Sequence, residues 1–137
     1  MIYVIDHNDS FTHNVVHQFA LFDKVECDNY DKISENKIKR ASTIVFSPGP
    51  GNPKNYPITS KIYKKYKGKK FKVGRYHSLK LKEPFKIKNF EITMRCIKSK
   101  VAMAFENNKD KIYGFQFHPE SFLTIDGNLL IKKILSA

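Results

Sequence analysis

Residues 2–19 read IYVIDHNDSFTHNVVHQF, a short apolar run followed by a polar turn and a segment with helical spacing. Residues 2–5 have the length and the boundaries of a buried strand. Asp9 or Ser10 can then cap a helix, because short side-chain oxygens accept hydrogen bonds from the free N–H groups at a helix start. Three apolar residues recur at helical spacing in that helix and predict a face directed at the core: Phe11, Val15 and Phe19.

The same order of strand and helix continues along the chain. Val25 and Cys27 share one face of a second short strand, residues 32–40 predict a weak helix or turn, and residues 43–46 predict a third strand. A loop rich in glycine and proline, SPGPGNP, follows, and a lysine-coated helix is predicted after it, from Ile58 to Tyr66. This alternation predicts an open, mostly parallel α/β sheet with helices on both faces.

The C-terminal half has a different character. Residues 90–97, 101–105 and 111–117 predict strands with short connections, which favour antiparallel pairing. A closing helix over residues 128–135 is expected to direct four apolar side chains at the core: Leu129, Leu130, Ile131 and Ile134. A chain of 137 residues suits a single compact domain.

Composition and charge narrow the possible classes. No apolar run approaches the roughly 20 residues that span a bilayer, and the N-terminus lacks the basic region of a signal peptide, so we expect a cytoplasmic protein. The two cysteines, Cys27 and Cys96, form no disulfide framework or zinc pattern, and both are expected in the core. The net charge of +12 comes almost entirely from dispersed lysines. This favours a solvated surface, with a basic nucleic-acid-binding module as the alternative.

Two segments carry residue types suited to chemistry. GFQFHPES, residues 114–121, places His118 and Glu120 two positions apart at the end of an apolar run. His118 as a general base held by Glu120 follows the logic of a catalytic triad, whereas the structural alternative is a buried strand that ends in a turn. SPGPG follows the third predicted strand, where open α/β sheets bind ligands. It either directs backbone N–H groups at an oxyanion or forms a tight turn.

Four motifs occur in a fixed order: IDHNDSFTHN, SPGPGNP, RYHSL and GFQFHPESFLT. Together they resemble the class I glutamine amidotransferases, and most closely the glutamine-hydrolysing component of anthranilate synthase and of aminodeoxychorismate (para-aminobenzoate) synthase. The resemblance covers most of the chain. It implies release of ammonia from glutamine for a chorismate-using synthase in tryptophan or folate biosynthesis. We expect no cofactor, no metal ion, no nucleic acid and no membrane among its partners.

The resemblance also implies two sets of site residues. The catalytic histidine and glutamate of the family correspond to His118 and Glu120. The oxyanion loop and the groups that hold the glutamine substrate correspond to a larger set: Gly49, Pro50, Gly51, Ser78 and Leu79.

The cysteine nucleophile of the family has no counterpart here. In the family it lies on a sharp turn, Gly-x-Cys-x-Gly-His-Gln, between the SPGPG and RYHSL motifs, where a strand, its elbow and a helix need roughly 30 residues. This chain runs YKGKKFKVGRYHSL across that interval. We therefore expect a single domain, residues 1–137, shortened near Lys70 and Phe71 and lacking the central strand–elbow–helix unit. Neither Cys27 nor Cys96 has the glycine-flanked turn of an exposed nucleophile.

Three interpretations follow from this departure. The chain is an amidotransferase component that is inactive without its nucleophile, a non-catalytic remnant that still binds the synthase, or a basic nucleic-acid-binding module. Loss of the central strand also predicts exposed strand edges and low stability. The SPGPG and HPES loops should still emerge at the same edge of the sheet.

Overall fold

The computed structural model describes residues 1–51, 53–65, 70–73, 83–84, 87–121 and 123–136. Its strands are β1 (Ile2–Asp6), β2 (Val25–Asn29), β3 (Thr43–Phe46), β4 (Lys70–Val73), β5 (Glu91–Arg95), β6 (Ala102–Asn107) and β7 (Ile112–Phe115). Its helices are α1 (Thr12–Ala20), α2 (Glu35–Arg40), α3 (Pro57–Lys65) and α4 (Gly127–Ser136), with a short 3-10 turn, η1 (Pro53–Asn55). Within the described ranges, no helix combines the length and the apolar character needed to cross a bilayer.

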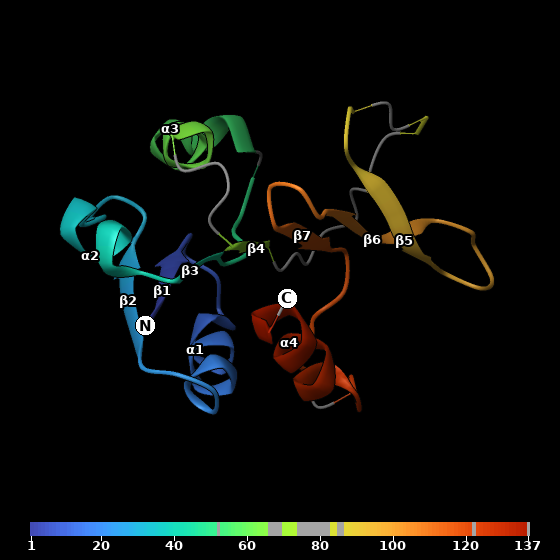
Figure 1. Ribbon diagram of the computed structural model, residues 1–137, viewed down its shortest axis with the longest axis horizontal. Coiled ribbons are helices and arrows are strands. Elements are labelled where there is room, and N and C mark those ends of the chain that lie inside the picture. Colours follow the sequence, from blue (N-terminus) through green and yellow to red (C-terminus); the bar gives the residue numbers. More distant parts are fainter. Residues whose placement is uncertain (52, 66–69, 74–82, 85–86, 122, 137) are drawn as a thin grey trace.

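The strands form one sheet in the order β2-β1-β3-β4-β7-β6-β5. Figure 1 shows this sheet between two helical layers, with α2 and α3 on one face and α1 and α4 on the other. Strands β2, β1, β3, β4 and β7 run parallel, whereas β6 and β5 continue the sheet by antiparallel pairing. The predicted α/β architecture with an antiparallel C-terminal part is confirmed. Because β3 and β7 are parallel, the loops that follow them emerge at the same sheet edge, as predicted.

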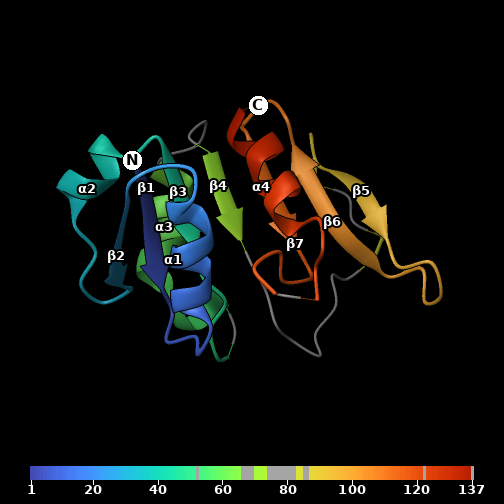
Figure 2. The ribbon, with the colours of Figure 1, turned by 90° about the horizontal axis from the view of Figure 1, so that it is seen from below.

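The middle of the sheet holds a strand that was not predicted. Strand β4 pairs in parallel with β3 on one side and with β7 on the other, so that Phe46, Val73 and Gly114 lie level. Figure 2 shows it between the part of the sheet behind α1 and the part behind α4. The expectation of a missing central strand is therefore wrong, because the segment that spans the expected junction, Lys70–Val73, occupies that position. Since β3 and β7 are both paired with it, their inner edges are covered, and the low stability predicted from exposed edges is no longer expected.

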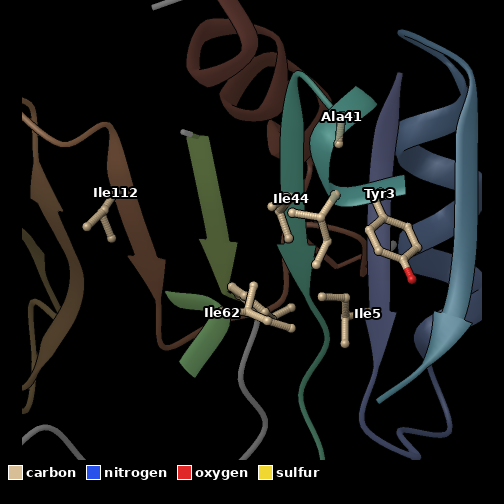
Figure 3. Close-up of a cluster of buried hydrophobic side chains, with 8 residues drawn as sticks. Tyr3, Ile5, Ala41, Ile44, Ile62 and Ile112 are labelled. Carbon is tan, nitrogen blue, oxygen red and sulfur yellow. The ribbon is translucent and has the colours of Figure 1, made fainter. Parts of the chain in front are cut away.

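Apolar side chains fill both faces of the parallel sheet. The cluster under α2 and α3, drawn in Figure 3, consists of Tyr3, Ile5, Ile38, Ala41, Ile44, Phe46, Ile62 and Ile112. The cluster under α1 and α4 consists of Ile2, Val4, Val15, Phe19, Val45 and Ile131. Successive residues of β1 thus point to opposite faces, and both faces are buried, as expected for a parallel strand between helical layers.

The start of α1 differs from the prediction. The helix begins after Phe11, and no side chain caps it. The Asp9 carboxylate instead accepts a hydrogen bond from the Phe11 N–H at 3.0 Å, within the preceding turn. Phe11 is 47% exposed, so Val15 and Phe19 alone form the buried stripe.

Four other side chains predicted for the core are not fully buried, among them Leu130 of α4, which is partly buried. Cys27 is exposed on the outer strand β2, and Cys96 is half-buried in the turn that follows β5. Leu129 in α4 is 54% exposed, because Ile131 and Ile134 carry the buried face of that helix.

The pairing of β4 on both sides predicts a strong response to proline at its centre. In Lys72→Pro the backbone N–H is lost and a neighbouring carbonyl is left unpaired, so the free energy of unfolding should fall by about 3 kcal/mol. Lys72→Ala keeps the N–H and should remain within about 1 kcal/mol of the original chain. Urea denaturation followed by circular dichroism measures both variants. Equal denaturation midpoints would show that residues 70–73 do not belong to the sheet.

Candidate functional site

The segment after β7 places a histidine and a glutamate side by side. His118 Nδ1 is hydrogen-bonded to Glu120 Oε1, and the two side chains are only 4% and 5% exposed. This bond orients the imidazole so that Nε2 is the ring nitrogen on the side away from Glu120. A histidine held in this way by a carboxylate is suited to general acid–base chemistry. The sequence pattern thus predicted a pair that the structure brings together.

The backbone of this segment is held from several sides. Thr124 Oγ1 donates a hydrogen bond to His118 O at 2.7 Å. Gln18 Nε2 donates to Pro119 O at 2.8 Å. At Gly127 a Cβ would lie 1.9 Å from Pro119 O, so α4 approaches the loop as closely as only glycine allows. These contacts hold the backbone that carries His118 and Glu120 in place.

The glycine-rich loop after β3 lies at the same edge of the sheet, two strands away from β7. Its Pro50 carbonyl accepts a hydrogen bond from the Tyr56 hydroxyl at 2.6 Å. Gly51 has a φ of 85°, in the left-handed region that glycine adopts readily. A Cβ on Gly49 would lie 2.5 Å from the His7 carbonyl oxygen, so the loop is packed directly against the end of β1.

The Asp6 carboxylate connects this loop to the start of α1. The Thr12 hydroxyl donates to Asp6 Oδ1 at 2.6 Å. Ser47 Oγ lies 3.4 Å from the same carboxylate oxygen, donates to Pro48 O at 2.6 Å and accepts a hydrogen bond from the His7 N–H at 2.8 Å. One side chain at the end of β1 therefore organises two neighbouring segments of the sheet edge. This role was missed from the sequence, because neither the spacing nor the residue type of Asp6 is distinctive.

A small apolar cleft lies below the two loops, between α1 and α4. Pro48 from the loop after β3 and Glu120 from the loop after β7 both line it, together with Gln18 of α1. The two predicted site segments therefore meet. In the described part of the chain, no three His, Cys, Asp or Glu side chains gather as ligands for a metal ion.

The carboxyl end of β4 lies between the two loops. Val73, its last residue, is level with Phe46 at the end of β3 and with Gly114 in β7. Ser78 and Leu79, the other predicted glutamine-binding residues, lie outside the described residues.

Neither cysteine lies near His118. Cys27 on β2 is four strand spacings from β7, roughly 19 Å, and Cys96 after β5 is two spacings away, roughly 10 Å. Although the Cys27 residue is exposed, its thiol loses part of its hydration, and this effect, with a smaller one from the nearby Asp6 and Asp28 carboxylates, raises its pKa to about 11. A hydrogen bond with Ser99 lowers the pKa of Cys96. A thiolate activated by a histidine must lie roughly 3 Å from it, so neither thiol is placed for activation by His118.

A buried histidine that was not identified from the sequence supports the Gly49 loop. His7 is 4% exposed, its Nε2 lies 2.8 Å from Thr59 Oγ1, and no described atom bonds its Nδ1. Its ring meets the Tyr56 ring edge-on, with 4.7 Å between the ring centroids. It lies parallel to the Tyr30 ring, with 5.9 Å between the centroids. Burial among these rings lowers the pKa of His7, against smaller opposing effects from backbone groups and a carboxylate.

Known proteins with similar sequence cover nearly the whole chain. The profile of the family described as "Glutamine amidotransferase class-I" matches residues 3–70 and 57–137. An anthranilate synthase component 2 from Archaeoglobus fulgidus is 31% identical over 98% of this chain and 97% of its own length. A protein of the same name from Lactococcus lactis is 28% identical, with coverages of 99% and 94%. A crystal structure of a Thermoplasma acidophilum protein assigned as one of the GMP synthase subunits shares the fold, with a TM-score of 0.76 at 14% identity and coverages of 98% and 92%.

These alignments are longer than the chain itself. The match to the Lactococcus protein runs over 186 positions, whereas this chain has 137 residues. The relative therefore has positions for which this chain has no residue. The two segments that match the family profile overlap at residues 57–70, immediately before the junction expected near Lys70.

The buried imidazole of His7 predicts a pH-dependent stability. Because the folded-state pKa of His7 lies below that of an unfolded histidine, about 6.5, the unfolded chain binds the proton more readily. The free energy of unfolding should therefore be highest above about pH 6.5 and fall as the pH drops from there toward the lower, folded-state pKa. In His7→Asn this part of the decline should disappear. Urea denaturation at several pH values from about 7 to 5 measures the effect.

His13 provides the control, because it is an exposed histidine in the same N-terminal segment. The His13→Asn variant should keep the decline of the original chain. If the His7→Asn and His13→Asn variants had the same pH profile, the stability effect would have to come from other groups.

Proposed function

The chain belongs to the class I glutamine amidotransferases, and on this premise we propose that it is the amidotransferase component of a chorismate-using synthase and does not hydrolyse glutamine by itself. The synthase would make anthranilate or aminodeoxychorismate. The observation that carries the proposal is the buried His118–Glu120 pair at one sheet edge with the Gly49–Gly51 loop, with no cysteine near either among the described residues. Relatives named anthranilate synthase component 2 match almost the full chain, which supports a place in the same kind of complex.

Hydrolysis of an amide by this route requires a thiolate. The thiolate attacks the side-chain carbonyl of glutamine, the amide nitrogen leaves as ammonia after taking up a proton, and water then cleaves the resulting thioester to give glutamate. We assign the proton transfers to His118, oriented by Glu120, and stabilisation of the oxyanion to the backbone of Gly49–Gly51. Ser78 and Leu79 are the residues assigned to the backbone groups of the substrate.

At the position expected for the nucleophile, the sequence has no cysteine to begin these steps. Strand β4 ends at Val73 between the two loops, and the sequence after Val73 contains no cysteine before Cys96. The greater length of the aligned relatives supports an internal loss near Lys70 and Phe71. Because β4 fills the middle of the sheet, the fold and a docking surface can persist without the lost unit. A cytoplasmic location, as expected from the sequence, belongs to the same proposal.

The first test measures ammonia release from glutamine. Removing the nucleophile of a triad typically lowers turnover about a millionfold, so we expect no detectable release by the chain, alone or with its synthase partner. Inserting the corresponding segment of the Archaeoglobus relative between Lys70 and Phe71 should restore some turnover, and His118→Ala in that variant should abolish it. If the unmodified chain released ammonia and a thiol alkylator blocked this release, Cys27 or Cys96 would have to act as the nucleophile.

The second test measures association with the synthase. The chain should bind a purified chorismate-using synthase component and elute with it in size-exclusion chromatography. An unrelated basic protein of similar size serves as the control, because the net charge of +12 favours non-specific association with acidic proteins. The experiment is run at physiological salt with chorismate-using components of both the anthranilate and the aminodeoxychorismate type. If the chain eluted separately from both, the proposed role would be ruled out.

A further inference from the structure

Gln18 belongs to the polar side of α1 by its sequence position, yet its side chain reaches across to the loop after β7. Its Nε2 donates hydrogen bonds to Pro119 O at 2.8 Å and to Asn128 Oδ1 at 2.9 Å. The side chain is half-buried and lines the same cleft as Glu120. A residue near the beginning of the chain is thus bonded to the backbone of the segment that carries the histidine and the glutamate.

The acceptor of this bond occupies a sensitive place. Pro119 lies between His118 and Glu120, and a proline has no N–H with which to anchor its own backbone. Its carbonyl is therefore the polar backbone group through which the protein can hold this residue. Gly127 packs against the same oxygen beside Gln18, since a Cβ there would lie 1.9 Å from Pro119 O and 3.3 Å from Gln18 Nε2. Rotation of this peptide group would move Glu120 relative to the His118 ring.

We propose that Gln18 is a positioning residue for the His118–Glu120 pair. Its side-chain amide fixes the Pro119 carbonyl and thereby the orientation in which the Glu120 carboxylate accepts the proton of His118 Nδ1. The second bond, to Asn128, aligns the Gln18 amide and ties α1 to α4. This role concerns the geometry of the pair and holds whether or not the chain hydrolyses glutamine.

The test follows the Nδ1 proton of His118 by NMR. A histidine N–H that donates to a carboxylate in a buried site gives a resonance far downfield of the amide region, and its exchange with water is slow. In Gln18→Ala we expect this proton to exchange about fivefold to tenfold faster, which corresponds to the loss of one ordinary hydrogen bond from its support. Circular dichroism establishes that the variant is folded. Unchanged exchange in a folded Gln18→Ala chain would overturn the proposal.

Two further variants separate positioning from packing. Gln18→Met keeps the length and volume of the side chain but cannot donate, so it should reproduce the faster exchange, and it decides the matter if Gln18→Ala does not fold. Asn128→Ala removes the tie to α4 and leaves the bond to Pro119, so exchange should stay within about twofold of the original. An effect of Asn128→Ala as large as that of Gln18→Met would show that helix packing, and not the Pro119 carbonyl, is responsible. Absence of the downfield resonance from the original chain would also overturn the proposal, because no held pair would exist.

Discussion

The backbone of β4 joins the two halves of this molecule. The glycine-rich loop belongs to the half built on β1, β2 and β3, whereas His118 and Glu120 belong to the half built on β7, β6 and β5. In the described ranges β3 and β7 pair with β4 and not with each other. Parallel pairing fixes the lateral spacing at roughly 4.8 Å per strand and also fixes the level at which each strand ends. The shared cleft of Pro48 and Glu120 depends on this alignment.

The segment from Asp6 to Gln18 gives the site its shape independently of any nucleophile. Asp6 and His7 hold the loop after β3 through Ser47 and through close packing on Gly49. Gln18 holds the loop after β7 through the Pro119 carbonyl. Both loops are therefore supported by the first strand and the first helix. The contacts that hold the two loops in place therefore come largely from residues outside both loops.

Local patterns were enough to predict much of the fold, and contacts distant in sequence account for the rest. Strands β1 and β3 are continuous apolar runs with clear boundaries, and the pairing of His118 with Glu120 follows from a spacing of two. Strand β4, with the sequence KFKV, has no such pattern, and only its partners on β3 and β7 make it a strand. Helical spacing places Gln18 on the polar side of α1 and gives no sign of its contact with the loop after β7. That contact could not be predicted, because its acceptor, the Pro119 carbonyl, lies 101 positions away in the sequence. The predicted cap of α1 is wrong because the Asp9 carboxylate accepts a hydrogen bond from the Phe11 N–H within the preceding turn instead.

The close approach at Gly127 has a consequence for how such a sequence can change. A chain rich in lysine, isoleucine and asparagine draws on codons made mostly of adenine and thymine, whereas each glycine codon begins with two guanines. Exchange of a glycine for a residue with an adenine- and thymine-rich codon requires room for a side chain. At the four glycines within the described ranges, Gly49, Gly51, Gly114 and Gly127, an added Cβ would meet another atom at 2.5, 2.9, 2.2 and 1.9 Å respectively. At Gly49 and Gly127 the atoms met include backbone carbonyl oxygens, those of His7 and Pro119, so a side chain at either position would force two segments of the chain apart.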